Sequence, residues 1–197
     1  MTTTVDFWFD PGCPFTWRTS RWLSEVAHRH SLAVTWRLLS LYVLNADKDL
    51  PADLRDRLAD THRAGLLLET VRIEYGNDML EAAYASIGTR LHDSHQQPDD
   101  GTFGAVLADV GLPHRLIAES AAGPVRDSLL ASHEAAQRAV GMESPSPIIR
   151  LDDGPAFFGP VVVPVPTGEE ADRLLAGVAA MSRVPAFSEL KRARRPF

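Results

Sequence analysis

The first 45 residues constrain the fold most strongly, because a strand, a sharp break and a helix follow one another there. Apolar side chains alternate with others over residues 5–9, which is the period of a β-strand. Asp10-Pro11-Gly12 then interrupts the extended chain, and Pro14 suits the first turn of a helix. Residues 33–43 are rich in β-branched and aromatic side chains and predict a second strand. This order is typical of a right-handed βαβ unit.

The middle of the chain, residues 46–141, carries helical signals throughout. Pro51 suits the start of a helix, and Asp78 followed by Glu81 matches a capping box. Gly141 is suited to end the last helix of this segment. We therefore predict an all-helical segment between two regions that contain strands.

The last part of the chain returns to strands. Short apolar runs at residues 148–151 and 156–158 flank the turn sequence Asp152-Asp153-Gly154-Pro155, which predicts a β-hairpin. A final helical stretch follows Thr167. The order predicts an α/β chain with a thioredoxin-like fold, built from βαβ and ββα halves, and a large all-helical insertion. The corresponding division is residues 1–45 and 142–197 for the thioredoxin-like domain and residues 46–141 for the insertion.

Composition and charge narrow the classes of function. The 197-residue chain has a net charge of −6, which argues against nucleic acid or an anionic membrane as the main partner. It contains one cysteine, so neither an intramolecular disulfide nor a cysteine-rich zinc site forms from this chain alone. No long apolar span and no secretory leader is visible. We expect a cytoplasmic protein without a metal site.

Cys13 is the residue best placed for chemistry. It lies between the predicted first strand and first helix, where unpaired backbone amides and the helix dipole stabilise a thiolate. A thiolate is the nucleophile in disulfide exchange. The alternative is a small buried apolar residue, which is the usual environment of a lone cysteine. A junction between a loop and a helix is rarely deep core, and this position therefore favours a functional thiol.

The residues around Cys13 carry a family resemblance. The segment Phe7-Trp8-Phe9-Asp10-Pro11-Gly12-Cys13-Pro14-Phe15-Thr16-Trp17 resembles the active-site segment of DsbA-like proteins of the thioredoxin superfamily. It is most similar to the mycothiol-dependent nitroreductases of actinobacteria, in which the motif reads Cys-Pro-Trp-Cys. Further matching segments extend over nearly the whole chain: Thr19-Ser20-Arg21-Trp22, Ser40-Leu41, Arg90-Leu91-His92, Phe157-Phe158-Gly159-Pro160, Gly168-Glu169-Glu170-Ala171 and Glu189-Leu190-Lys191-Arg192. The resemblance implies a thioredoxin fold, redox chemistry at Cys13 and a low-molecular-weight thiol as partner.

Thr16 departs from the family pattern, because it occupies the position of the second, resolving cysteine. A threonine hydroxyl is no substitute for a thiolate, and only a monothiol mechanism remains at Cys13. We predict that Thr16 donates a hydrogen bond to the Cys13 sulfur and stabilises its charged form. Equally, Thr16 is interpretable as a helix-start residue that bonds to its own backbone.

The resemblance implies further site residues. It places a cis-proline at Pro147, opposite the cysteine, and gives Ser146 the role of pairing its backbone with an extended substrate. Pro14, Phe15 and Trp17 are predicted to contact the substrate or thiol, with Phe15 in the cleft and Trp8 in the core.

Arg90 and His92 are placed by the same resemblance at the rim of the cleft, with Arg90 as an anchor for the polar part of a thiol. His92 and His95 share a spacing that suits a metal, but a solvated helix end is the preferred interpretation. His133 is interpreted as a core histidine, while His28 and His30 suit the C-terminal end of the first helix. Arg192, Arg194 and Arg195 are interpreted as a solvated basic terminus.

These observations predict a DsbA-like thiol oxidoreductase or thiol transferase that works through Cys13 by a monothiol mechanism. No cofactor is expected to bind tightly; mycothiol or glutathione serves as co-substrate, and a small molecule or a protein disulfide as substrate. A homodimer is left open. Two alternatives remain. One is an enzyme that resembles kappa-class glutathione transferases and 2-hydroxychromene-2-carboxylate isomerases, which activate a bound thiol with a hydroxyl residue. The other is a non-catalytic module that binds peptides or small molecules.

Overall fold

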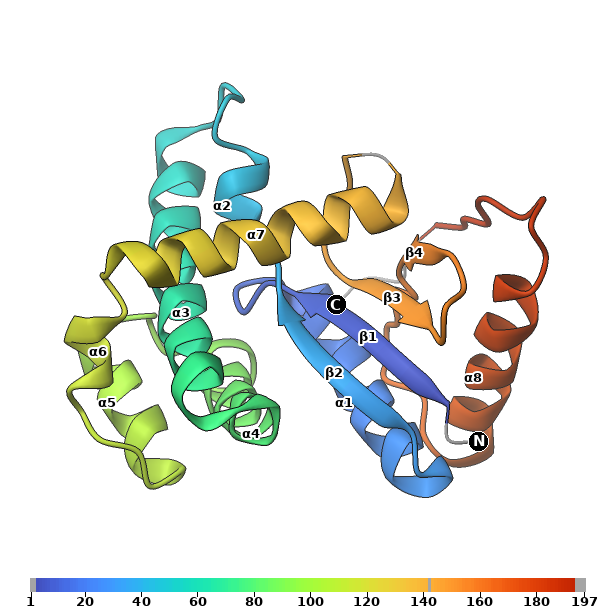
Figure 1. Cartoon of the computed structure of the whole chain (residues 1–197), viewed down its shortest axis with the longest axis horizontal. Coiled ribbons are helices and arrows are strands. Elements are labelled where there is room, and N and C mark those ends of the chain that lie inside the picture. The colour runs from blue at the N-terminus through green and yellow to red at the C-terminus, as the bar shows by residue number, and fades with distance from the viewer. Residues whose placement is uncertain (1–2, 142, 194–197) are drawn as a thin grey trace.

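The computed structural model describes residues 3–141 and 143–193, and its centre is a four-stranded sheet of order β2-β1-β3-β4 (Figure 1). Strand β1 (Thr4–Phe9) pairs in parallel with β2 (Ala33–Leu38) and antiparallel with β3 (Ile148–Leu151). Strand β4 (Ala156–Phe158) completes a hairpin with β3. With helix α1 (Pro14–His30) between β1 and β2, and α8 (Gly168–Ser182) after the hairpin, this is the thioredoxin-like arrangement that the sequence predicts.

Helical structure fills the chain between β2 and β3. The segments are α2 (Leu41–Leu44), α3 (Ala52–Tyr75), α4 (Asn77–Gly88), the π-helical turn η1 (Thr89–Asp93), α5 (Asp100–Asp109), α6 (Leu116–Glu119) and α7 (Gly123–Val140). Figure 1 shows α3 to α6 grouped beside the β2 edge of the sheet, while α7 returns across it. The exact division into two domains at residues 46 and 141 stays a prediction.

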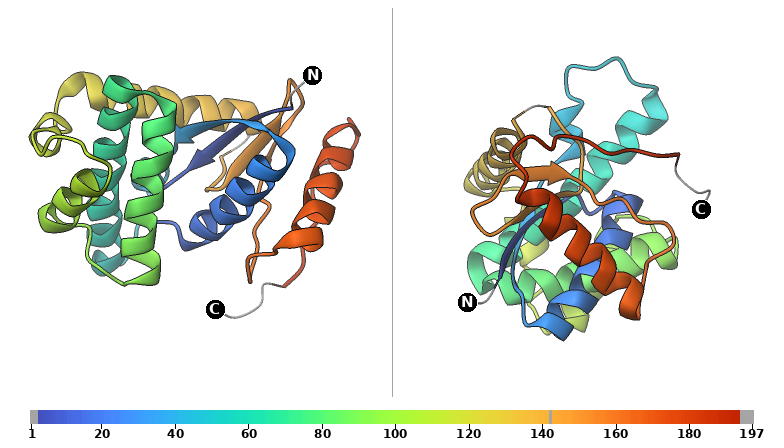
Figure 2. Two further views of the ribbon diagram at one scale, coloured as in Figure 1. Left: turned by 90° about the horizontal axis from the view of Figure 1, so that it is seen from below. Right: turned by 90° about the vertical axis from the view of Figure 1, so that its right-hand side faces the viewer.

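The two faces of the sheet are covered by different helices. Helices α1 and α8 cover one face and α7 covers the other (Figure 2). The apolar side chains of Val5, Phe7 and Phe9 belong to the larger core, which extends into the insertion. Trp8 points to the opposite face and packs with Ala136 of α7 in a smaller cluster. The C-terminal half of β1 is therefore buried between two layers, and the loop that follows Phe9 starts from a fixed position.

The second strand is shorter than predicted. It ends at Leu38 rather than at residue 43, and α2 begins at Leu41. The hydroxyl of Ser40 accepts a hydrogen bond from the amide of Val43, which is the bond of a helix N-cap. This cap favours a helix over a longer strand, although the following residues have high β propensity. It gives the Val43 amide a hydrogen-bond partner, whereas β1 ends at Phe9 and cannot pair with an extension of β2.

The capping box predicted at Asp78 and Glu81 is wrong. Helix α4 begins at Asn77, with Gly76 as its N-cap residue, so that Asp78 lies inside the first turn. Asn77 instead binds the neighbouring strand, because its side chain pairs with the backbone amide and carbonyl of Trp36. Glu81 accepts a hydrogen bond from Ser24 of α1.

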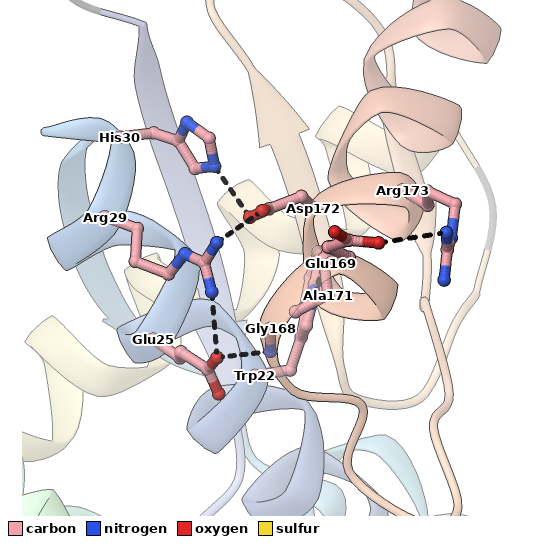
Figure 3. Close-up of polar contacts among 9 residues, drawn as sticks. All are labelled: Trp22, Glu25, Arg29, His30, Gly168, Glu169, Ala171, Asp172 and Arg173. Atoms are coloured by element: carbon pink, nitrogen blue, oxygen red, sulfur yellow. Dashed lines mark hydrogen bonds and ion pairs between the residues drawn. The ribbon is translucent and has the colours of Figure 1, made fainter.

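Polar contacts join the C-terminal end of α1 to the N-terminal end of α8 (Figure 3). Asp172 lies 2.6 Å from the guanidinium of Arg29 and 2.8 Å from Nε2 of His30. The Glu25 carboxylate accepts a hydrogen bond from the Gly168 amide. His28 and His30 lie in the last turn of α1, as predicted, and the cap itself is the backbone amide of Ser31, which has a left-handed conformation.

Within the described part of the chain, no helix combines the length and apolar character that a membrane crossing requires. Of the predicted basic terminus, Arg192 is exposed, while Arg194 and Arg195 lie outside the described residues.

Candidate active site

The loop from β1 to α1 is organised by the side chain of Asp10, which directly follows the strand. Oδ1 accepts a hydrogen bond from the Gly12 amide at 2.8 Å, and Oδ2 accepts one from the Leu41 amide at 2.7 Å. The backbone carbonyl of Asp10 accepts a hydrogen bond from the Cys13 amide at 3.1 Å. One buried carboxylate thus joins the segments that leave the two parallel strands. Sequence reasoning missed this role, because Asp-Pro-Gly is common in turns and was accounted for as a strand break.

Cys13 is the N-cap residue of α1 and has an extended backbone conformation. Its sulfur lies 3.7 Å from the backbone carbonyl of Ser146, and the thiol donates to that oxygen. The residue is 6% exposed, which is more buried than the loop position predicts. The reason is that the loop is covered from several sides. Pro14 and Pro145, the chain neighbours of the two contacting residues, are exposed.

Thr16 lies one turn into α1 and is completely buried. Its hydroxyl donates a hydrogen bond to Oγ of Ser146 at 2.9 Å. The predicted hydrogen bond from Thr16 to the Cys13 sulfur is therefore wrong, because the single hydroxyl proton is directed to Ser146. Cys13 and Thr16 instead hold two different atoms of the same residue, and they fix the start of α1 against the segment before β3.

The segment before β3 carries the other half of the site. The Ser146–Pro147 peptide bond is cis, and the Pro147 carbonyl accepts a hydrogen bond from the Gly159 amide at 2.8 Å. Gln137 of α7 holds Ser144 by its side-chain amide, which both donates to and accepts from the Ser144 backbone. Among the described residues, none bonds to the backbone amide of Ser146. The pairing with an extended substrate that the family resemblance implies for Ser146 stays a prediction, and the residue is 3% exposed.

The helical insertion contacts the Cys13 loop at two points. A Cβ atom at Gly12 would lie 2.4 Å from Cγ2 of Thr61 on α3, so that only glycine fits at this position. From η1, Nε2 of His92 donates to the backbone carbonyl of Pro11 at 2.8 Å. His92 is half-buried, and the solvated position predicted for it is wrong. π-helical turns are often found at functional sites, and here the turn directs His92 to the loop.

Trp17 is part of the core rather than of a substrate-facing wall. It is 4% exposed, its ring stacks on that of His92, and its indole N–H donates to Asp93. The guanidinium of Arg21 lies 4.1 Å from the ring centroid. The predicted contact of Trp17 with a substrate is therefore wrong, since α1, α4 and η1 cover the side chain. Phe15 is half-buried and Pro14 is exposed, so these two can still contact a substrate.

Arg90 has a partner that the sequence does not reveal. Its guanidinium forms an ion pair of 2.7 Å with Asp109 of α5, which competes with the predicted role as an anchor for a thiol. His133 is buried, as expected of a core histidine, and its Nδ1 lies 3.5 Å from the Ser40 amide. Among the described residues, no group of three or more His, Cys, Asp or Glu side chains is arranged to hold a metal ion.

The electrostatics of the site are dominated by burial. Loss of hydration raises the pKa of the Asp10 carboxyl from 3.8 to about 6, against the opposing effect of its two amide partners. Burial also raises the pKa of Tyr84, and the negative charges of Cys13 and Asp10 act in the same direction. The Tyr84 phenol therefore stays protonated. The pKa values of His62 and His92 are lowered from 6.5 by burial, which keeps both rings neutral at pH 7.

Comparison with known proteins places these features in context. The model of a family described as "Mycothiol-dependent nitroreductase Rv2466c" matches residues 12–192, a range that includes Cys13, Thr16 and Pro147. The chain is 34% identical over 200 residues to the uncharacterised protein Rv2286c of Mycobacterium tuberculosis, and the match covers 98% of this chain and 84% of that protein.

Solved structures share the fold at low sequence identity. A 2-hydroxychromene-2-carboxylate isomerase superposes with a TM-score of 0.63 at 15% identity, covering 92% of this chain and 95% of that one. The cytosolic disulfide reductase DsbM of Pseudomonas aeruginosa, solved with GSH, has a TM-score of 0.59 at 14% identity, with 90% and 99% covered. These similarities confirm the predicted DsbA-like thioredoxin fold.

Proposed function

Because the chain belongs to the family of the mycothiol-dependent nitroreductase Rv2466c, we propose that it catalyses thiol–disulfide exchange through Cys13 by a monothiol mechanism. The observation that supports this most directly is the position of the sulfur. It lies at the N-terminus of α1 and 3.7 Å from the carbonyl of Ser146, next to a cis-proline. A helix N-terminus stabilises a thiolate, and an extended segment beside it provides a place for a substrate.

The first step is an exchange between Cys13 and a disulfide. The Cys13 thiolate attacks one sulfur of the substrate, a new S–S bond forms between Cys13 and that sulfur, and the other half leaves as a thiolate. The proton that Cys13 shares with the Ser146 carbonyl is released to solvent before the attack. The Ser146 amide is then free to pair with the substrate backbone or with an amide of a small thiol.

The second step requires an external thiol. Thr16 has no sulfur, and its hydroxyl is bonded to Ser146, so an intramolecular resolving step is excluded. A second thiolate attacks the mixed disulfide, regenerates the Cys13 thiolate and leaves with the transferred group as a new disulfide. The net reaction exchanges one thiol for another and conserves electrons.

The external thiol is mycothiol or glutathione in this proposal. The family description names mycothiol, and the similar DsbM structure contains GSH. A reaction that consumes a reduced thiol in each cycle requires a reducing compartment, which supports a cytoplasmic location. Phe15 and Pro14 are the side chains next to Cys13 that remain accessible for contact with the thiol.

The experiment that tests this function is intact-mass analysis after incubation with oxidised mycothiol or oxidised glutathione. We expect one adduct of the mass of a single thiol, removed by an excess of the reduced thiol. Cys13→Ser serves as the matched control and must form no adduct. Absence of an adduct on the wild-type protein with both disulfides contradicts the proposal. If Cys13→Ser retains isomerase or glutathione-transferase activity, the isomerase-like alternative replaces it.

A further inference from the structure

The Asp10 side chain is buried next to the site without touching the reacting sulfur. It is 2% exposed, and its two oxygens are each bonded to one backbone amide, those of Gly12 and Leu41. Neither amide belongs to the regular hydrogen bonds of β1 or β2, and a carboxylate is the group that satisfies two converging N–H donors best. The arrangement links the Cys13 loop to the start of α2 through one charge.

We propose that Asp10 is a positioning residue for Cys13: its carboxylate fixes the Gly12 amide and thereby the direction in which the Cys13 sulfur meets Ser146 and an incoming sulfur. This inference rests on the proposed function. Disulfide exchange requires the attacking, central and leaving sulfurs to lie nearly in line. A loop that moves by about 1 Å therefore slows it strongly.

The geometry leaves few other means of fixing the loop. Gly12 has no side chain, and its backbone is pressed against Thr61 of α3 on one side. The Pro11 carbonyl is held by His92 on the other. Both contacts come from the insertion, whereas Asp10 connects the loop to the start of α2, which directly follows β2. If the carboxylate loses its charge, its hold on Gly12 weakens while the two contacts from the insertion persist.

Several titratable groups lie near Asp10 or near the residues that hold it, and each comes from a different part of the chain. Tyr84 approaches from α4 and Cys13 from α1. His62 of α3 and His133 of α7 both bind Ser40, the residue before Leu41, and His92 approaches from η1. Burial lowers the pKa values of these three histidines, so any titration that they show falls below 6.5. Their ring protons can be followed separately from the amides that report on Asp10.

The experiment compares Asp10→Asn with the wild-type protein in the rate of mixed-disulfide formation with oxidised glutathione between pH 5 and 8. Asparagine keeps the size of the side chain but directs an NH₂ group at one of the two amides. We expect a rate roughly 10- to 100-fold lower at pH 7.5. The ratio of the two rates should approach one as the pH falls through the Asp10 titration near 6. A purely structural role leaves this ratio independent of pH.

Asp6→Asn is the matched control. Asp6 lies on β1, four residues before Asp10, and pairs with Arg37 of β2 and Arg150 of β3. We expect this variant to react at the wild-type rate once its folded fraction is taken into account. If Asp10→Asn also reacts at the wild-type rate at every pH, the positioning role is contradicted.

Two measurements separate this inference from the proposed function. If the wild-type protein forms no mixed disulfide, the proposed function fails. The positioning role of Asp10 is then tested separately, by the ratio of the rates at which iodoacetamide alkylates Cys13 in the wild type and in Asp10→Asn. If Asp10→Asn does not fold, an NMR pH titration of the wild-type protein tests whether the Asp10 carboxylate holds the two amides. The Gly12 and Leu41 amide protons should then shift together with a midpoint near pH 6. Amide shifts that do not follow this titration contradict the inference.

Discussion

At its N-terminus, helix α1 meets a buried carboxylate and a buried sulfur, whereas at its C-terminus it meets exposed ion pairs. Asp10 and Thr16 are shielded from solvent at the first end. At the second end, Asp172 pairs with Arg29 and His30, and all three side chains remain substantially in contact with water (Figure 3). Both ends join α1 to other elements, but they do so in different dielectric surroundings.

The two ends of α1 differ in how their polar groups affect the free energy of unfolding. Exposed ion pairs gain little because water screens them, and they also cost little to form. A buried carboxylate loses its hydration, and two amide hydrogen bonds restore only part of it, as the raised pKa of Asp10 shows. A polar group that is retained at such a cost next to a nucleophile is typical of a functional site. This difference supports our proposal that the N-terminal end of α1 carries the function.

The largest expected effect is the pH dependence that Asp10 imposes on stability. Its pKa is 3.8 when unfolded and about 6 when folded, so the folded state binds more protons between these values. The contribution of Asp10 to the free energy of unfolding should therefore fall as the pH rises from 4 to 7, by about 3 kcal/mol for a shift of this size. Urea denaturation of wild type and Asp10→Asn at several pH values measures it as the difference between the two curves. If the difference between the two curves is constant with pH, burial of the charged Asp10 carboxylate does not destabilise the folded state.

The second effect tests how tightly α3 presses on the same end. Gly12→Ala places a methyl group 2.4 Å from a Thr61 carbon, and one of the two segments must move. We expect a loss of about 1–3 kcal/mol in the free energy of unfolding and a slower reaction of Cys13. The matched control is Gly177→Ala on α8, where no atom of the described residues lies within 4 Å of the added atom. That change should stabilise the helix by up to about 1 kcal/mol.

The third effect concerns the hydroxyl pair of Thr16 and Ser146. Thr16→Val keeps the shape of the side chain and removes a buried hydrogen bond of 2.9 Å. We expect a loss of about 1 kcal/mol in the free energy of unfolding. Ser146→Ala removes the same bond from the other side, and the double variant should therefore lose less than the sum of the two single variants. Additive losses in chemical denaturation would show that the pair is not coupled.

The sequence predicts the elements of the fold better than the contacts at the site. The period of β1, the Pro-Gly turns and the helix-ending glycines are local signals, and the thioredoxin-like order follows from them. Cys13 and Ser146-Pro147 were identified through the family resemblance together with their local context. Asp10 was missed because its partner, the Leu41 amide, lies 31 residues away and is brought close only by the parallel pairing of β1 and β2. The contact of Trp17 with Asp93 spans 76 residues and that of Arg90 with Asp109 spans 19, so local patterns do not reveal them either.

The C-terminal end of α1 also shows that local sequence patterns do not reveal partners that are distant in sequence. The helix dipole correctly suggests that cations are suited to residues 28–30, but it acts only within one helix. The carboxylate that Arg29 and His30 bind belongs to α8, more than 140 residues later. A local rule therefore predicts the sign of the charge and not its partner.

The smallest expected effect is at this exposed end. Asp172→Ala removes the partner of Arg29 and His30 at once, and we expect a loss of no more than about 1 kcal/mol in the free energy of unfolding. The loss should shrink in 1 M salt, because screening weakens exposed charges. A double-mutant cycle with Arg29→Ala, measured by urea denaturation, isolates the ion pair of 2.6 Å. Cys13 should react at the wild-type rate in every member of the cycle, because the contacts of Asp172 among the described residues are with Arg29 and His30 and not with the Cys13 loop. A coupling energy as large as the Asp10 effect, or a changed rate at Cys13, would mean that the two ends of α1 do not differ as their burial indicates.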